Sequence, residues 1–272
     1  MPARNEENYI RQTLDSLLNQ TRTPDEIIVV LGRCNDRTPE IVKEYVSKHN
    51  IVKVVDKQDS KYGSTFLRAF PIAEAINAGI KQITSDVDFI MIANADSVYS
   101  DTYIEEALEI MHREEDCAIV GFKDYASIRG SGAVYRRSFL SKVIGGVFKE
   151  CAAEDTFMQF AAMGMNYKII EIRKSKLIFL REPGSGSLLH KIKYAAAQGY
   201  ASYTLGMSFW YVILRSGFWI MHKKFSAFAI PLGFTYAFFA KAERLDKLFP
   251  DAAKNWQKTR IQEELRFISR ND

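Results

Sequence analysis

Residues 89–96, Phe-Ile-Met-Ile-Ala-Asn-Ala-Asp, decide the fold. The first five are apolar without interruption, which is typical of a strand buried on both faces of a sheet, and polar residues follow at once. The same pattern occurs at 27–31, Ile-Ile-Val-Val-Leu, and more weakly at 51–55. Helical patterns begin at Thr38-Pro39 and run over 71–83, between these strands. Alternating strands and helices predict an α/β fold with a mostly parallel sheet.

Further elements extend this pattern on both sides. At the N-terminal end we expect a helix capped by Asn5, with the apolar Ile10 and Leu14 on its buried face. Shorter strands are predicted at 118–121, 167–172 and 177–180, and a helix at 154–163 that ends at Gly164. Ligands of parallel sheets bind beyond the carboxyl ends of the strands. The loops 31–38 and 94–100 are therefore expected to form the edge that holds the site.

Composition limits the class of protein. The chain has 272 residues, 47% hydrophobic and 26% charged, which suits one large core with a tail and lacks the dense basic surface of a nucleic-acid binder. Residues 181–272 hold 14 Lys and Arg against 7 Asp and Glu, so the positive charge lies in the tail. The cysteines, Cys34, Cys117 and Cys151, are odd in number and far apart, which indicates neither a disulfide framework nor a zinc site. A reducing, cytoplasmic setting is expected.

Four short motifs occur in a fixed order along this pattern: Pro-Ala-Arg-Asn-Glu-Glu at 2–7, Asn-Asp-Arg-Thr at 35–38, Asn-Ala-Asp-Ser at 94–97 and Glu-Asp at 154–155. Together they resemble the family 2 glycosyltransferases over residues 2–190. The resemblance implies a GT-A, Rossmann-like fold and an inverting transfer of sugar from a nucleotide donor. It also implies a catalytic domain at 1–190, followed by a hydrophobic helical extension at 191–272.

The resemblance implies a donor pocket made by two loops. The residues it assigns to base and ribose are Pro2, Ala3, Arg4, Asn5, Glu7, Arg33 and Asp36. The family commonly has two aspartates directly after the second strand, whereas this chain has Leu31-Gly32, so that Asp36 is the single carboxylate of its loop. The first-turn acids Glu6 and Glu7 could instead serve only the dipole of a helix.

The third motif implies a metal. Asn94, Ala95 and Asp96 occupy the Asp-x-Asp position that holds Mg²⁺ or Mn²⁺ against the donor diphosphate, and Asp96 would be the charged ligand. Because Asn94 is neutral, the metal affinity should depend on the phosphates of the nucleotide. An alternative is that Asp96 caps the next helix, a role open also to Ser97 and Asp101.

The fourth motif implies the catalytic base. Asp155 matches the position that takes the proton of the acceptor as it attacks the anomeric carbon, and Glu154 would orient it. Adjacent acids at a helix start could also serve only the helix dipole. If the acceptor is already an anionic phosphate, Asp155 would only position it.

The acceptor side is assigned by the same resemblance. The Gly-Ser-Gly-Ala segment at 130–133 would let the acceptor approach the backbone at Gly132, and Arg136 or Arg137 would meet phosphate unless both are plain surface residues. Residues 181–187 resemble a loop that closes over the donor, with Gly184 and Gly186 giving it backbone freedom. His190 is carried over as a further phosphate or metal contact.

The tail contains two aromatic, apolar stretches, 205–222 and 225–240, and a charge-rich amphipathic pattern at 245–267. Arg215 interrupts the first stretch, and Pro231 and Gly233 interrupt the second. We expect a re-entrant or interfacial arrangement at the cytoplasmic face of a membrane, or possible integration through these segments, and hence a lipid-phosphate or glycan acceptor. A place in the soluble core or a dimer interface is the alternative.

The start of the pattern departs from the family. Members normally have an apolar strand just before the motif at 2–7, and here only Met1 precedes it. We therefore expect the first strand to be missing. Loss of a central strand exposes ladder groups and removes core side chains, so the natural reading frame is expected to start upstream, or this form to be poorly stable or inactive.

Two other functions remain open on the sequence. A sugar nucleotidyltransferase also combines an α/β sheet with metal-binding acids, but it would have a Gly-rich, basic loop directly after an N-terminal strand. A degenerate scaffold with the GT-A fold is suggested by Leu31-Gly32 and Asn94, whereas Asp96 and Asp155 argue for an enzyme. The expected donor is UDP- or GDP-linked, and no nucleic-acid partner is expected.

Overall fold

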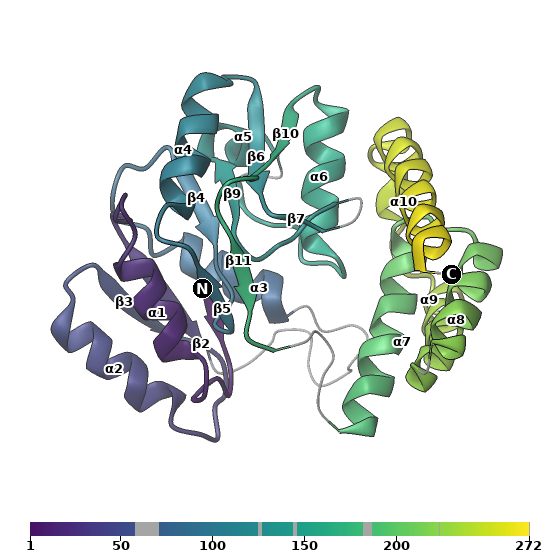
Figure 1. The fold of residues 1–272 in the computed structure, drawn as a ribbon, viewed down its shortest axis with the longest axis horizontal. Coiled ribbons are helices and arrows are strands. Elements are labelled where there is room, and N and C mark those ends of the chain that lie inside the picture. Colours follow the sequence, from purple (N-terminus) through teal and green to yellow (C-terminus); the bar gives the residue numbers. More distant parts are fainter. Residues whose placement is uncertain (58–70, 125–126, 144–145, 182–186, 223, 272) are drawn as a thin grey trace.

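The computed structural model describes residues 1–57, 71–124, 127–143, 146–181, 187–222 and 224–271. A sheet with helices on both faces forms one part of the molecule, and the C-terminal helices α7 to α10 lie beside it (Figure 1). The α/β fold predicted from the strand and helix patterns is confirmed.

The sheet consists of two sections. In the first, β1 (Pro2–Ala3), β2 (Ile27–Leu31) and β3 (Val52–Asp56) are parallel in that order. In the second, the order is β10 (Lys168–Glu171), β6 (Cys117–Gly121), β9 (Ala133–Arg136) and β4 (Phe89–Ile92). β10 is parallel to β6, and β9 is antiparallel to both of its neighbours. Two small ladders, β5 (Ser97–Tyr99) with β11 (Leu177–Phe179) and β7 (Lys123–Asp124) with β8 (Ser127–Ile128), lie outside these sections.

Two hydrophobic cores lie on opposite faces of the sheet. Along β4 the side chains alternate, since Ile90 and Ile92 belong to one core and Phe89 and Met91 to the other. The first core includes α3 (Pro71–Ile80), α5 (Arg137–Lys142) and α6 (Glu154–Gly164). The second includes α1 (Ile10–Leu18), α2 (Thr38–Lys48) and α4 (Tyr103–Arg113). Burial on both faces explains why β2 and β4 are apolar without alternation.

Two local predictions are wrong. The first helix begins at Ile10 rather than just after Asn5, because Asn5 adopts a left-handed conformation (φ 57°) and Glu6 and Glu7 precede the helix. Ala133 and Arg136, both assigned to the acceptor side by the resemblance, are the two ends of β9 in the middle of the second section. A third prediction needs correction in part: residues 2–3 do form a short first strand, and the Met1 amino group donates to the Ile28 carbonyl at 2.8 Å.

The C-terminal helices are α7 (Leu188–Thr204), α8 (Phe209–Met221), α9 (Ala229–Phe239) and α10 (Pro250–Asn271). α7 and α9 cross closely at Gly199 and Gly233, where any added Cβ would overlap a backbone carbonyl of the opposite helix. α10 packs on α6 through Trp256 against Phe160, so one hydrophobic core continues from the sheet into these helices. Among the described residues, no helix combines the length and apolarity that a bilayer crossing requires.

Candidate active site

The two loops predicted to bind the donor are joined by hydrogen bonds. The Asn5 side chain accepts from the Asn35 amide at 2.8 Å, and the Glu7 carboxylate accepts from the Arg37 amide at 3.0 Å. In return, Asp36 accepts from the Glu7 amide at 3.1 Å. The left-handed backbone of Asn5 directs its side chain to the second loop. These side chains therefore hold the two loops against each other.

Asp36 is engaged on both carboxylate oxygens, because Oδ1 accepts from the Thr38 amide at 3.1 Å and Oδ2 from the Glu7 amide. Partial burial would raise the pKa of Asp36, but hydrogen bonds from Thr38 and Glu7 outweigh it and lower the pKa. Asp36 is thus an ionised anchor for the loop. The neighbouring Arg4 donates from Nε to the Arg33 carbonyl at 3.2 Å, and Arg33 itself is exposed.

Pro2 and Ala3 lie in β1 rather than in a loop. The Ala3 side chain is buried, and its carbonyl accepts from the Gly32 amide at 2.9 Å. These residues lead the chain from the sheet into the loop, and the buried Ala3 could meet a ligand only through its backbone.

Hydrogen bonds among buried hydroxyl groups hold the loop after β4 in place. The buried Tyr99 hydroxyl lies 2.9 Å from Ser131 Oγ, which donates to Ser97 Oγ at 3.1 Å. The Asn94 amide donates to Tyr99 Oη at 3.3 Å, Ala95 is buried, and the Asn94 side chain is exposed. Burial raises the pKa of Tyr99 to about 12, so this phenol remains neutral and can donate.

Arg181 joins the first and third motifs. Its guanidinium donates to Glu6 Oε1 at 2.7 Å and to Asp96 Oδ2 at 2.9 Å, and it lies over the Tyr9 ring. Glu6 Oε2 is buried and has no hydrogen-bond partner among the described residues. Burial raises the pKa of Glu6 in spite of this ion pair. The alternative that Asp96 caps a helix is wrong, since α4 begins at Tyr103 with Thr102 as its N-cap.

Glu6 was not among the candidate donor residues, although it belongs to the motif at 2–7. The only signal in the sequence was its place between Asn5 and Glu7, and nothing in the sequence paired it with Arg181, 175 residues away. The structure also gives Arg181 a role in the site that the loop resemblance did not state.

The oxygen atoms near Asp96 suit a metal ion that takes its remaining ligands from a diphosphate. The described residues contain no group of three or more His, Cys, Asp or Glu side chains that could hold an ion by themselves. Asp96 and the exposed amide of Asn94 offer two oxygens, and Glu6 has an oxygen without a partner. Mg²⁺ and Mn²⁺ accept one or two protein carboxylates when phosphates supply the remaining ligands.

Two carboxyl groups open α6. Glu154 and Asp155 follow Ala153, which has a left-handed backbone (φ 62°), and a Cβ added at Gly130 would lie 3.2 Å from Asp155 Oδ2. Asp155 Oδ1 accepts from the Thr156 amide at 2.7 Å. Burial, and then the charge of Asp155, raise the pKa of Glu154 to about 8, and burial also raises the pKa of Asp155. Such a pair can hold one proton near neutral pH, which leaves one carboxylate that can accept a proton as a general base.

Residues 130–132 link the acids of α6 to the loop after β4. Ser131 contacts the hydroxyl network under Asn94, and Gly130 lies against Asp155. Gly132 has φ +79°, and a Cβ there would overlap the Tyr103 hydroxyl, which donates to the Gly132 carbonyl at 3.1 Å. Only glycine fits both the backbone and the space. The motif at 94–97 and the motif at 154–155 therefore both contact the loop at 130–132.

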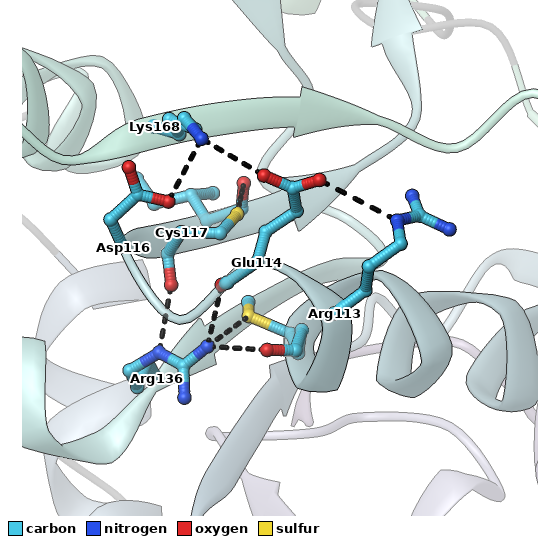
Figure 2. Close-up of polar contacts among 8 residues, drawn as sticks. Arg113, Glu114, Asp116, Cys117, Arg136 and Lys168 are labelled. Carbon is cyan, nitrogen blue, oxygen red and sulfur yellow. Dashed lines mark hydrogen bonds and ion pairs between the residues drawn. The ribbon is translucent and has the colours of Figure 1, made fainter.

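The assignment of Arg136 to phosphate is wrong. Figure 2 shows its guanidinium against the end of α4 and the start of β6, where it donates to the carbonyls of Met111, Glu114 and Cys117 at 2.6, 3.1 and 2.8 Å. Arg136 pairs with Phe89 at the start of β4, whereas Asn94 follows the end of that strand. Arg136 therefore closes the opposite edge of the sheet.

Arg137 also lies at that opposite edge, so its assignment is wrong as well. It donates to the Val87 carbonyl at 3.2 Å and pairs with Asp86 at 3.5 Å. His190 lies in the first turn of α7 with an exposed side chain, and its amide donates to Ser187 Oγ, the N-cap of that helix. Residues 182–186 of the predicted closing loop lie outside the described residues, including Gly184 and Gly186.

The α/β sheet carries acidic loops and a half-buried carboxyl pair at one edge, which agrees with the GT-A class of glycosyltransferases. The model of the family described as "Glycosyl transferase family 2" matches residues 1–166. This chain belongs to glycosyl transferase family 2.

Several named proteins resemble it. The probable glycosyltransferase YdaM of Bacillus subtilis is 28% identical over 206 residues, which cover 62% of this chain and 47% of YdaM. A dolichyl N-acetyl-alpha-D-glucosaminyl phosphate 3-beta-D-2,3-diacetamido-2,3-dideoxy-beta-D-glucuronosyltransferase of Methanococcus voltae is 24% identical over 75% of this chain and 62% of its own. The chain thus spans less than two thirds of the length of these relatives.

Among solved structures, the mannosyltransferase PcManGT of Pyrobaculum calidifontis, in complex with GDP-Man and Mn²⁺, has a TM-score of 0.57 at 15% identity, over 96% of this chain and 82% of its own. Residues 1–349 of S. aureus TarS, in complex with UDP-GlcNAc, have a TM-score of 0.53 at 19% identity, over 76% of this chain and 66% of that one. These likenesses show the shared fold.

Proposed function

We propose that this protein is an inverting glycosyltransferase, which transfers a sugar from a nucleoside diphosphate donor to a lipid-linked or glycan acceptor. The observation that carries the proposal is the half-buried Glu154–Asp155 pair, in which Asp155 lies beside Gly130 of the loop that also supports Asn94. A group able to accept a proton near neutral pH thereby lies at the same sheet edge as the acids of the donor loops.

In the proposed reaction, an acceptor oxygen attacks the anomeric carbon from the face opposite the nucleotide. The new bond joins that oxygen to the sugar, the bond from the anomeric carbon to the diphosphate oxygen breaks, and the nucleoside diphosphate leaves with its electron pair. Asp155 takes the proton of a hydroxyl acceptor, and Glu154, protonated at neutral pH by its raised pKa, keeps the pair at one negative charge. A phosphate acceptor would need no proton transfer.

On the donor side, the positive charge of Arg181 and a divalent cation would face the diphosphate. Bound Mg²⁺ or Mn²⁺ would stabilise the negative charge of the leaving diphosphate, and Asp96 with Asn94 would hold the ion. Arg181 would exchange its contacts with Glu6 and Asp96 for phosphate oxygens. Donors linked to UDP or GDP are proposed, because the two solved relatives carry UDP-GlcNAc and GDP-Man.

A lipid-linked acceptor at a membrane surface is supported by the C-terminal helices. α8 exposes Trp210, Leu214 and Met221 along one side, and α9 exposes Leu232 and Phe239 at helical spacing. Cations at the ends of these helices, Lys224 and Lys241, are exposed and suit anionic headgroups. The name of the Methanococcus relative includes a dolichyl phosphate, which has the same chemistry. We further propose a reducing, cytoplasmic setting, because the thiols of Cys34, Cys117 and Cys151 are free.

The decisive experiment follows the fate of the nucleotide. With a polyprenyl phosphate or a polyprenyl-linked sugar as acceptor, the protein should release nucleoside diphosphate from its cognate UDP- or GDP-sugar. Asp155→Asn should lower the rate about 100-fold or more with a hydroxyl acceptor, while the exposed control Asp116→Asn keeps full activity. Pyrophosphate release from a nucleoside triphosphate and a sugar phosphate would instead support a nucleotidyltransferase, and donor binding without turnover would support a scaffold.

Membrane binding is tested separately. The wild type should float with vesicles that contain anionic lipid, and Trp210→Ser with Phe239→Ser should abolish flotation while nucleotide binding stays unchanged. If both forms stay with the soluble fraction at low and high salt, the membrane part of the proposal is wrong.

A further inference from the structure

An open pocket of about 510 Å³ lies at the C-terminal end of α9, which packs beside α7 (Figure 1). One wall is aromatic: Tyr203 of α7 makes an edge contact with Phe238, and Phe238 makes one with Phe239. The other lining residues belong to the segment after α9 and are Lys241, Ala242, Glu243, Arg244 and Lys247. The pocket therefore has an apolar wall and a charged wall.

The charged wall carries a net positive charge. Its acidic residue, Glu243, is engaged elsewhere, because it pairs with Lys149 of the catalytic domain at 2.8 Å. Lys241 and Lys247 are exposed, and within the described part of the chain neither forms an ion pair. Their charges are thus available to an anion from outside the protein.

Arg244 supplies a third cation, and its side chain is already held in place. The carboxylate of Asp246 accepts from Nε at 2.7 Å and from Nη2 at 2.8 Å. The guanidinium carbon also lies 5.3 Å from the centre of the Tyr203 ring. A side chain held on its edge and on its face loses little conformational entropy when it meets a ligand.

Lys241 occupies a backbone position at which glycine is the usual residue. It follows Ala240, the C-cap of α9, and has a left-handed backbone (φ 53°). Its amide donates to the Phe238 carbonyl at 3.1 Å, and the Ala242 amide donates to the Ala237 carbonyl at 2.9 Å, which closes the helix. A Cβ is strained in this conformation. A lysine kept at such a position indicates a use for its side chain at the pocket.

The ligand that fits both walls is a phosphate with attached apolar chains. Phosphate oxygens suit two ammonium groups and a guanidinium. Phe238 and Phe239 are 58% and 76% exposed, and the exposed Leu232 continues this apolar surface along α9. A soluble phosphate would leave that surface in water, whereas a lipid would cover it.

We propose that this pocket binds the headgroup phosphate of an anionic phospholipid. The groups around the phosphate are the three cations Lys241, Arg244 and Lys247. Phe239 contacts the acyl chains. Because Glu243 beside the pocket pairs with Lys149, shortly before α6, a lipid bound here fixes how the catalytic edge is oriented to the bilayer. The inference rests on the membrane part of the proposed function and assigns a site to one class of lipid.

The test measures binding of the full chain to phosphatidylcholine vesicles with and without phosphatidylglycerol. Lys241→Gly with Lys247→Ala removes both exposed lysines and gives position 241 the residue that its backbone favours. This pocket variant should keep or raise the Tm of the wild type. It should bind the phosphatidylglycerol vesicles about tenfold or more weakly, and the phosphatidylcholine vesicles as the wild type does.

The matched control is Lys254→Ala with Lys258→Ala, which removes two exposed cations of α10 outside the pocket. Both variants have the same net charge, so their comparison separates a site from general attraction to an anionic surface. The control should lose about twofold or less in binding, because charges outside the pocket act only through screened attraction.

The possible outcomes separate this pocket from the rest of the account. Equal losses in the two variants would overturn the pocket and leave the membrane part of the proposed function standing. A wild type that binds neither kind of vesicle would overturn both. A lower Tm in the pocket variant would show that its lysines serve the fold, against the proposal. Glycerol phosphate is the soluble probe: if it raises the Tm of the wild type but not of the pocket variant, while both bind vesicles equally, the assignment to a lipid is wrong.

Discussion

At the scale of single residues, the chemistry rests on charges that the fold keeps close together. Glu154 and Asp155 are adjacent and half-buried, and Glu6 and Asp96 share one guanidinium. Neither arrangement would be stable with every group ionised and unpaired. The first is relieved by a raised pKa, and the second by Arg181.

The raised pKa of Glu154 predicts a pH dependence of stability. In the folded state this pKa is about 8, against 4.5 for the ordinary group, so the folded state keeps a proton that the unfolded state loses between these values. The stability that this group contributes is present below pH 4.5 and is lost as pH rises toward 8.

Glu154→Gln should therefore match the wild type in Tm near pH 4.5 and exceed it increasingly up to pH 8, by several degrees. Thermal unfolding across pH 4.5 to 8.5 measures the difference. The exposed Glu115→Gln serves as the control and should show no such trend. A difference between Glu154→Gln and wild type that is constant across this range would contradict the assignment.

At the scale of elements, the sequence allowed the apolar strands β2 and β4 to be predicted but not β9. The runs at 27–31 and 89–92 are apolar throughout because other elements cover them on both faces. Such a run is visible in the local sequence. β9 follows a glycine-rich loop and ends at Arg136, directly before Arg137 of α5, and its four residues become a strand by pairing with β4 and β6. Long-range pairing of this kind leaves no local periodicity.

The same strand explains the error at Arg136. Four residues in extended conformation span about 13 Å, so Arg136 lies at the other edge of the sheet from Gly132. In a loop, these two residues could have met at one ligand.

Arg136→Ala should destabilise the protein by about 2 kcal/mol, because three backbone carbonyls would lose a charged donor. Denaturant unfolding measures the change, and nucleotide binding should not alter. Arg137→Ala is the matched control and should cost much less, since its partner Asp86 is fully exposed. A loss of donor affinity in Arg136→Ala with unchanged stability would restore its assignment to phosphate.

The α7–α9 crossing gives another element-scale prediction. Gly199→Ala should destabilise the chain by about 2 kcal/mol or more, because the added methyl group overlaps the Ile230 carbonyl. Gly217→Ala on α8 is the control, since its Cβ would meet nothing within 4 Å, and it should be neutral or slightly stabilising. Chemical denaturation of both variants compares them, and equal stabilities would show that the helices do not pack as described.

At the scale of the whole molecule, one edge of the sheet gathers the residues of all four motifs, while the opposite edge is closed by Arg136 and Arg137. The sequence predicted this edge because the apolar runs of the strands end there. The roles of Asp96 and Asp155, assigned by motif, stay predictions. The sequence could not predict the contact of Arg181 with Glu6, which depends on how the last strand, β11, returns beside β5.

The measurement that tests the central claim most directly is the thermal shift of the protein with UDP- and GDP-sugars, with and without Mn²⁺. The account predicts that one nucleotide class raises Tm in a metal-dependent manner, that Asp96→Ala abolishes this shift, and that the exposed control Asp101→Ala retains it. Absence of a shift with every donor, or a shift that Asp96→Ala leaves unchanged, would contradict a donor site at this edge of the sheet.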